Sequence, residues 1–302
     1  MKDYIAQVCN SEPDFLGESC RWDQVHQELL WVNQPAGPGQ MYRATVNGPD
    51  VCIIRRYDFN GSPSAFAPLA GVDKGWIVAI DRSLWLLERD GELSEVAAPY
   101  PAEMVEVHLN DGAADPWGRF WIGSMASDAA AGRGALFRLD AVTGLDTIFE
   151  GITISNGIAW SPRGDTMYYV DSGPGTIRAF DVDAEGGLLS SRLFAQFDVA
   201  REGTPDGVCI DQEGGVWVAV WGGYQVRHYS SDGELLERVH LDTAQPSSCA
   251  LGGPAGTTLY ITTAQEDMSA EQLAAEPHAG RLFCAEVGVR GLALSTFTTP
   301  AT

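Results

Sequence analysis

The sequence predicts an all-β protein, a six-bladed β-propeller with four antiparallel strands in each blade around a central channel. The main observation is a short aromatic and aliphatic segment that recurs six times, at intervals of roughly 43 to 48 residues, which is the length of a propeller blade. The second is that no long stretch keeps the 3.6-residue apolar period of a helix. The six segments are 29–32, 75–78, 120–123, 168–170, 216–218 and 259–261.

Each repeat has the same expected order of elements. A turn precedes the aromatic strand, and another strand follows it after a loop, most clearly at 134–140, 176–181 and 225–229. Glycine-containing hairpins at 90–92 and 232–234 then begin the outermost strand. The best short helix candidate is 269–275. A pair of β-sandwiches would explain the strands but not six evenly spaced copies, so we expect one propeller domain over residues 1–302.

The charge of the chain limits its partners. There are 41 acidic and 19 basic residues, for a formal net charge of −22. Nucleic acids and anionic membranes need a surface concentrated in Lys and Arg, so neither partner is expected. The sequence shows no apolar leader at its start and no apolar run of about 18 residues that would span a membrane. We expect a cytoplasmic protein, monomeric or a small homo-oligomer, and its six cysteines, which include no Cys-x-x-Cys pair, are expected to be free thiols.

Polar residues of metal-binding type stand where the inner strands of several repeats begin. They are Glu18, the pair Asn110 and Asp111, Asn156 and Asp206. In a propeller the inner strands face the channel, so residues at equivalent places of different repeats meet at one end. Carboxylates and amides aimed at one axis form an oxygen-rich site for a divalent cation. A bound cation would also relieve the repulsion between the carboxylates.

Each of these residues also has a simpler interpretation. Asn-Gly and Asp-Gly are the commonest hairpin dipeptides, so Asp111, Asn156 and Asp206, each followed by Gly, are individually typical of tight turns. Glu18 alone is typical of a solvated loop. The joint placement at equivalent repeat positions favours a site for Glu18, Asn156 and Asp206. It does less for Asp111, because its neighbour Asn110 is the alternative residue to face the channel.

Four motifs together resemble the senescence marker protein/gluconolactonase family, which includes regucalcin and sugar lactonases. The motifs lie at 16–18, 110–125, 155–162 and 203–207, and the resemblance extends from about Leu16 to Phe283. It implies a six-bladed propeller with a single divalent metal held by Glu18, Asn156 and Asp206. It further implies that Asn110 contacts metal-bound water or substrate.

The chain departs from the family pattern at one informative place. Many sugar-lactone members have an Arg two residues before the Asn of the third motif, where it binds substrate hydroxyls, and this chain has His108. An ordinary strand or turn residue is the alternative for His108. A carboxylate somewhat after that motif assists substrate binding in some members, and Asp128 is the nearest candidate, with a solvated loop charge as its alternative.

The function expected from these residues is opening of a sugar lactone to the free acid. A divalent ion (Ca, Zn, Mn, Mg or Fe(II)) would act as a Lewis acid, and Asp206 would also be the base that receives the proton of the attacking water. His108, Asn110 and Asp128 would bind the small-molecule lactone. No Gly-x-Ser-x-Gly or His-Glu-x-x-His motif supports serine or zinc-protease chemistry. The alternatives are a non-catalytic calcium- or metal-binding regulatory propeller and a metal-dependent hydrolase of other esters.

Overall fold

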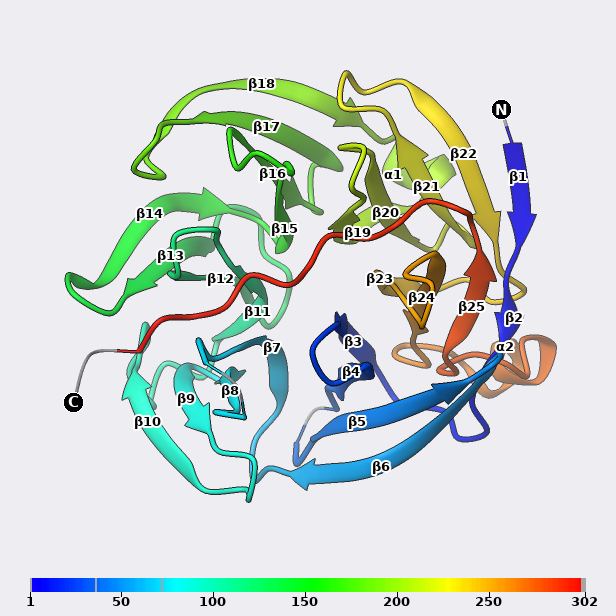
Figure 1. Ribbon diagram of the computed structural model, residues 1–302, viewed down its shortest axis with the longest axis horizontal. Coiled ribbons are helices and arrows are strands. Elements are labelled where there is room, and N and C mark those ends of the chain that lie inside the picture. The colour runs from blue at the N-terminus through cyan, green and yellow to red at the C-terminus, as the bar shows by residue number, and fades with distance from the viewer. Residues whose placement is uncertain (1, 36, 72, 300–302) are drawn as a thin grey trace.

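The computed structural model describes residues 2–35, 37–71 and 73–299 and confirms the predicted propeller. Six sheets surround a central axis, and in each the strand order runs from the channel outward (Figure 1). The first four blades follow the chain in order. They comprise β3 (Gly17–Asp23), β4 (Glu28–Asn33), β5 (Gln40–Asn47) and β6 (Asp50–Asp58); β7 (Pro63–Pro68), β8 (Trp76–Ile80), β9 (Ser83–Leu87) and β10 (Leu93–Ala97); β11 (Val107–Ala114), β12 (Phe120–Ala126), β13 (Gly134–Asp140) and β14 (Gly144–Ile152); and β15 (Ser155–Trp160), β16 (Thr166–Asp171), β17 (Thr176–Val182) and β18 (Leu188–Gln196).

The last two blades include strands from the start of the chain. The fifth contains β19 (Thr204–Ile210), β20 (Val216–Trp221), β21 (Gln225–Tyr229) and β22 (Leu235–His240), and β1 (Lys2–Ile5) adds to β22 in parallel. The sixth contains β23 (Pro246–Gly252), β24 (Thr258–Thr263) and β25 (Phe283–Glu286), and β2 (Gln7–Val8) completes it by pairing antiparallel with β25. Residues from both ends of the chain therefore close the ring.

The repeated aromatic residue is the centre of each blade. It lies on the second strand, and in all six blades it is among the largest fully buried side chains: Trp31, Trp76, Trp121, Tyr168, Trp217 and Tyr260. Burying so large an apolar surface between neighbouring blades is the main stabilising contribution available to such a fold. The six-fold repeat seen in the sequence is thus the repeat of the core.

Helices are short in the described part of the chain. They are α1 (Val199–Glu202) and α2 (Ala270–Ala275), and α2 confirms the helix candidate at 269–275. Ser269 caps α2, because its side chain accepts from the backbone N–H of Gln272 while the Gln272 side chain accepts from the Ser269 N–H. Among the described helices, none has both the length and the apolar character needed to cross a membrane.

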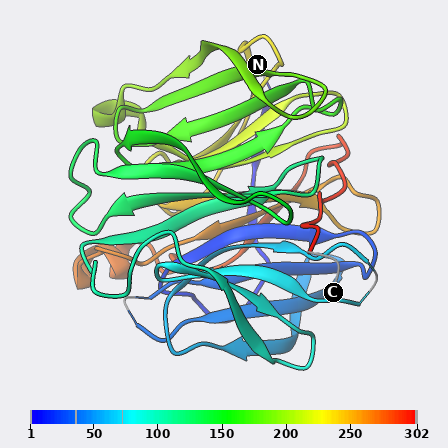
Figure 2. The same cartoon turned by 90° about the vertical axis from the view of Figure 1, so that its left-hand side faces the viewer.

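The segment after β25, residues 288–299, crosses one face of the propeller, and we call it the C-terminal strap (Figure 1, red). The Gln24 side chain donates to the Leu292 carbonyl at 2.7 Å, and Phe297 is 2% exposed, with its N–H donating to the Pro68 carbonyl at 2.8 Å. Gln24 and Pro68 lie where β3 and β7 end, so the strap covers the end of the channel at which inner strands finish. Figure 2 shows it along a single face.

Candidate functional site

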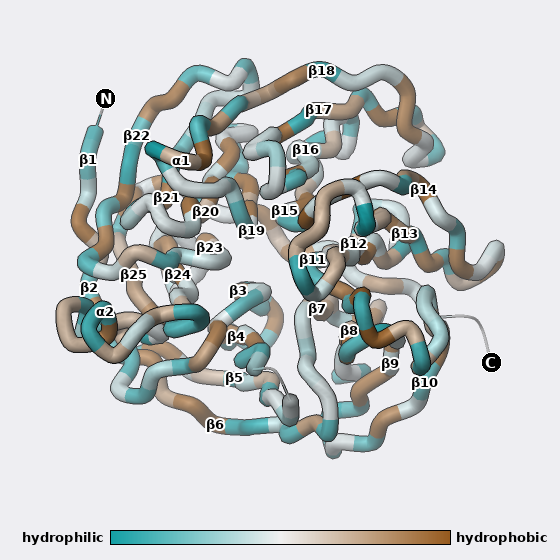
Figure 3. The backbone as a smooth tube through the Cα atoms, turned by 180° about the vertical axis from the view of Figure 1, so that it is seen from behind, coloured by the Kyte–Doolittle hydropathy of each residue, from teal (hydrophilic) through white to brown (hydrophobic). Residues whose placement is uncertain are grey.

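The predicted site residues lie at the other end of the channel, where the inner strands begin; Figure 3 shows the molecule from that side. Each inner strand is irregular here. The pairing with the second strand shifts between Glu18 and Arg21, Leu109 and Gly112, Ser155 and Ile158, and Pro205 and Val208. Such bulges insert an extra residue and re-aim the neighbouring side chains. In the third, fourth and fifth blades, the first residue inside the shift is Asn110, Asn156 and Asp206 respectively.

The glycines that follow two of these residues allow the inner strands to approach one another. A Cβ on Gly157 would lie 2.5 Å from the Asp206 carbonyl oxygen, and a Cβ on Gly207 would lie 2.7 Å from the Ser248 hydroxyl. No larger residue fits either position without moving backbone. The Asn-Gly and Asp-Gly pairs are therefore needed for close approach of blades and do not form hairpin turns.

Three carboxylates gather at this end of the channel, and the pKa of each is raised, first of all by burial. Burial, and then the charge of Asp111, raise the pKa of Glu18 to about 8. Burial, and then the charges of Glu18 and Asp111, hold the pKa of Asp206 well above its usual range. Asp111 and Asp206 are each only 5% exposed. We call Glu18, Asp111 and Asp206 the carboxylate cluster.

The cluster has fewer hydrogen-bond donors than its oxygen atoms require. Asp206 Oδ1 is buried and has no hydrogen-bond partner among the described residues. Asn156 opposes the raised pKa of Asp206 through a hydrogen bond, and its amide also donates to the Ser172 hydroxyl at 3.1 Å. A buried carboxylate oxygen without a donor is costly, so this atom indicates a place for a ligand.

The charge of the cluster fits one divalent cation. Burial raises the pKa of Asp111, and Arg21, 3.5 Å away, opposes that rise, so that one of the three carboxylates has a protein counter-ion. Ionised Glu18 and Asp206 would then leave two negative charges beside the Asn156 amide. This donor set consists of oxygen atoms, as hard and borderline divalent ions prefer. The described residues contain no group of three or more His, Cys, Asp and Glu side chains arranged for a metal. The expected ligand set has only two such residues, because its third member, Asn156, is an amide.

Comparison with known proteins places the chain in a family. The model of the SMP-30/gluconolactonase/LRE-like region matches residues 16–265, which include every residue of the carboxylate cluster. The chain belongs to this family.

Several members of the SMP-30/gluconolactonase/LRE-like family align with nearly the whole chain. The 6-deoxy-6-sulfogluconolactonase of Pseudomonas putida is 32% identical over 288 residues, covering 95% of this chain and 96% of that protein. Human regucalcin is 31% identical over 292 residues, covering 92% and 93% respectively. The structure of a calcium-binding regucalcin from Agrobacterium tumefaciens superposes with a TM-score of 0.87 at 26% identity and covers 98% of both chains.

The structure brings some of the predicted substrate-binding residues to the site. Asn110 is half-buried, and its amide donates to the Ser155 carbonyl at 3.0 Å, next to Asn156. His108 lies two residues earlier on β11, where burial lowers its pKa, and its Nδ1 is 3.4 Å from the Ser127 hydroxyl. A neutral imidazole at this position would be suited to hydrogen bonding with a sugar hydroxyl.

Asp128 is placed differently from the other predicted residues. It is exposed in the loop after β12, where its Oδ1 accepts from the backbone N–H of Ala130 at 3.0 Å. No described hydrogen bond joins it to the carboxylate cluster. Its predicted part in substrate binding remains a prediction.

The sequence analysis underestimates one residue of the site, Asp111, and does not identify another, Arg21. Asp111 was ranked below Asn110, yet it belongs to the carboxylate cluster. Arg21 was not identified, although it follows Glu18 on the same strand. Because three carboxylates stand where inner strands begin, a positively charged side chain near them could have been expected, and Arg21 is the nearest one in the sequence to Glu18. The bulge that turns Asp111 toward the other carboxylates has no sequence signal of its own.

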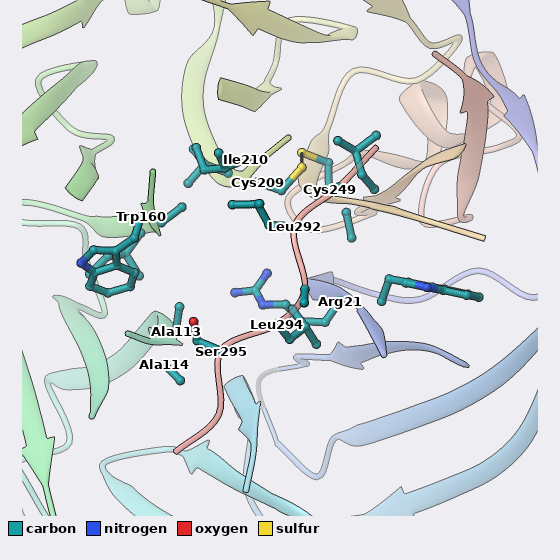
Figure 4. A pocket seen from close by; sticks show the side chains of 18 of the residues that line it. Arg21, Ala113, Ala114, Trp160, Cys209, Ile210, Cys249, Leu292, Leu294 and Ser295 are labelled. Carbon is teal, nitrogen blue, oxygen red and sulfur yellow. Dashed lines mark hydrogen bonds between the residues drawn. The ribbon is translucent and has the colours of Figure 1, made fainter. Parts of the chain in front are cut away.

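Arg21 also separates the site from a cavity at the strap end. Its guanidinium donates to the carbonyls of Cys20 and Gly112 at 2.9 and 3.0 Å. Arg21 also lines a cavity of about 330 Å³, which the C-terminal strap borders with Leu292 and Leu294 (Figure 4). Cys209 and Cys249 line it with their sulfur atoms 3.7 Å apart, and both are free thiols as expected.

Proposed function

We propose that the chain is a divalent-metal-dependent lactonase that opens a sugar lactone to the free acid. The observation that carries the proposal is the carboxylate cluster, in which Asp206 Oδ1 has no hydrogen-bond partner among the described residues, at the end of the channel where the inner strands begin. The names of relatives support the choice of lactone, because one is a 6-deoxy-6-sulfogluconolactonase and is similar over nearly its whole length.

Glu18, Asn156 and Asp206 would hold the ion. A divalent ion bound there supplies Lewis-acid polarisation of the lactone carbonyl and stabilises the charge that develops on its oxygen. Asp111 would not bind the ion directly, because Arg21 lies 3.5 Å from its carboxylate and partly neutralises it. The remaining negative charge of Asp111 would still attract the ion.

The protein residues divide the remaining tasks. Asp206 would take the proton of the attacking water, because Oδ1 is held in the site without a donor of its own. Asn110, whose amide is anchored on the Ser155 carbonyl, would orient the substrate through its side-chain oxygen. Neutral His108 would accept or donate a hydrogen bond to a substrate hydroxyl, in place of the charge that an Arg would provide.

The test is hydrolysis of a panel of aldonolactones by chelator-treated protein, before and after addition of Ca, Zn, Mn, Mg or Fe(II). We expect activity to disappear on stripping and to return with at least one ion. Asp206→Ala should abolish turnover and weaken metal binding in a folded protein. Asp232→Asn is a suitable control, because Asp232 is exposed on the outer hairpin of the fifth blade. Full activity of Asp206→Ala, or activity indifferent to stripping, would contradict the proposal.

A non-catalytic metal-binding propeller is the second candidate, because a structural neighbour is described as a calcium-binding protein. A buffer should surround its ion with many protein oxygens, whereas a hydrolase keeps positions open for water and substrate. The three ligands proposed here favour the hydrolase. Calcium binding by a folded protein that leaves every lactone of the panel intact would favour the binder.

A further inference from the structure

A turn of the second blade is fixed against the predicted substrate-binding residues. Asp81 and Arg82 connect β8 to β9 at the end of the propeller where the site lies. The backbone N–H of Leu109 donates to the Asp81 carbonyl at 2.7 Å. Because Leu109 follows His108 directly, this hydrogen bond brings the turn next to His108, and the charge of Arg82 reaches the His108 imidazole.

The conformation of the turn is unusual and well anchored. Asp81 has a φ of +52°, in the left-handed region that residues other than glycine seldom adopt. Its Oδ1 accepts from the backbone N–H of Ser62 at 3.0 Å, which holds the carboxylate toward the preceding inner strand. A Cβ on Gly61 would clash with this carboxylate at 2.2 Å, so the glycine makes room for it. Strain of this kind is retained where a precise backbone position matters.

Arg82 has a charge without a protein partner. It is half-buried, its Nε is buried without a hydrogen-bond partner, and no ion pair of Arg82 occurs within the described residues. Arg43 and Arg119, by contrast, pair with Glu28 and Asp115 at 2.7 and 2.6 Å. Arg238 and Arg281 are likewise half-buried and without an ion pair among the described residues, so Arg82 is singled out by its position beside His108 and at the edge of a cavity.

Arg82 borders a cavity of about 360 Å³ together with polar Asn60 and Ser83 and aromatic Phe59 and Trp85. Burial is the main cause of the lowered pKa of His108; Asp81 opposes it, and the Arg82 guanidinium lies near enough to add to it. A planar guanidinium with free N–H groups is the side chain best suited to carboxylate, phosphate or sulfonate oxygens. Asn60 and Ser83 can add neutral hydrogen bonds.

We propose that Arg82 and this cavity form an anion subsite, and that the substrates are sugar lactones bearing an anionic group away from the lactone carbonyl. This inference rests on the proposed lactonase function for its reaction. Carboxylate, phosphate and sulfonate share the relevant chemistry, and Arg82 recognises any of them through charge-assisted hydrogen bonds.

The first experiment compares kcat/KM of the metal-loaded protein for a neutral aldonolactone and for lactones of similar size with a terminal carboxylate, phosphate or sulfonate. The wild type should prefer at least one anionic lactone, and added salt should reduce that preference. Arg82→Gln should lower the ratio of anionic to neutral kcat/KM by roughly 10- to 100-fold, mainly through KM, as expected for a lost hydrogen bond to a charged group. Arg82→Lys should restore part of the ratio.

Arg163→Gln is the matched control, because the Arg163 side chain is 84% exposed and pairs with Asp165, away from the site. It should leave the ratio unchanged. An equal loss on neutral and anionic lactones in Arg82→Gln would overturn the anion subsite, and so would a wild type without any anionic preference.

A binding measurement separates failure of the subsite from failure of the lactonase function. Calorimetry with a sugar 6-phosphate and its neutral parent sugar should show tighter binding of the phosphate, and Arg82→Gln should remove the difference. If no lactone is hydrolysed but this difference is present, the subsite stands without the reaction. If lactones are hydrolysed but the two sugars bind alike in wild type and variant, the reaction stands and the subsite is overturned.

Discussion

Two buried aspartates five residues apart, Asp206 within β19 and Asp211 just after it, show how differently one protein can treat the same side chain. Both are nearly inaccessible, at 5% and 1% exposure. Asp211 accepts from the backbone N–H groups of Glu213 and Gly215 and from the Trp217 indole at 3.0 Å. For Asp206, Oδ1 has no hydrogen-bond partner within residues 2–35, 37–71 and 73–299.

Burial raises the pKa of both side chains, and the difference between them comes from the groups that surround each carboxylate. Burial alone would raise the pKa of Asp211, but His228, Trp217 and the Gly215 N–H together lower it. Burial and the neighbouring charges of Glu18 and Asp111 raise the pKa of Asp206. A buried carboxylate with a full set of donors holds a fold together, whereas one without them is prepared for a ligand.

The largest expected effect is on Asp206. Asp206→Asn removes the base and the charge of one proposed ligand, so kcat/KM for the best lactone should fall by about 100- to 10,000-fold, the contribution typical of a positioned base. The metal-free variant should unfold at the same or a higher denaturant concentration than the wild type, because a desolvated, repelled carboxylate is gone. Loss of stability together with activity would break the contrast with Asp211.

Asp211→Asn should give the opposite result. The free energy of unfolding should fall by about 2–4 kcal/mol, because the buried donors of Trp217 and Gly215 lose a charged acceptor and His228 Nε2 loses the carboxylate 3.0 Å away. Turnover per folded molecule should be unchanged. Denaturant unfolding and a kinetic assay on the same preparation measure the two quantities. A variant of wild-type stability would show that the donors of Asp211 contribute little.

Asp14 is a third buried aspartate, and the number of hydrogen bonds that it accepts lies between those of Asp206 Oδ1 and Asp211. Trp31 Nε1 donates to it at 2.8 Å, while burial raises its pKa from 3.8 to about 7. Below pH 3.8 the carboxyl is protonated in both folded and unfolded chains. As the pH rises toward 7, the unfolded chain ionises first, so this group lowers stability progressively, by at most about 4 kcal/mol.

The corresponding measurement is denaturant unfolding between pH 4 and pH 8 for the wild type and Asp14→Asn. The difference in stability between the two proteins should grow in favour of the variant as the pH rises, and then level off above about 7. A difference independent of pH would mean that Asp14 ionises normally in the fold.

The smallest expected effect is on Asp128. Asp128→Asn keeps an oxygen that can accept from the Ala130 N–H but removes the charge. An exposed charge interacts weakly, so KM for a lactone should rise by at most about fivefold if the side chain assists binding. An unchanged KM would leave Asp128 as a loop-capping residue alone.

The fold could be predicted from the sequence because its core is periodic. Trp31, Trp76, Trp121 and Trp217 mark the second strand of four blades, and the polar residues before them therefore mark inner strands. The joining of β1 and β2 to the last two blades could not be predicted, because pairing between strands so far apart in sequence leaves no local pattern.

The site could be predicted less completely. Glu18, Asn156 and Asp206 were placed at one end of the channel by their repeat positions. Asp111 was given less weight because a bulge of one residue decides which side chain faces inward, and sequence alternation does not locate bulges. No sequence pattern indicates the proposed role of Arg82, because a backbone hydrogen bond between two blades, from Leu109 to Asp81, brings its turn to the site.

Because β2 from the start of the chain completes the last blade, the order of synthesis limits when that blade can form. β2 ends at Val8, and its partner β25 begins at Phe283, 275 residues later. At the usual elongation rate of about 5–20 residues per second, the ribosome needs on the order of 15 to 60 s to make the intervening chain. Throughout that interval β2 has no partner, whereas β1 can pair with β22 and the first five blades can already assemble. The last blade is therefore the final one to form on each newly made molecule, and the channel takes its finished shape only then.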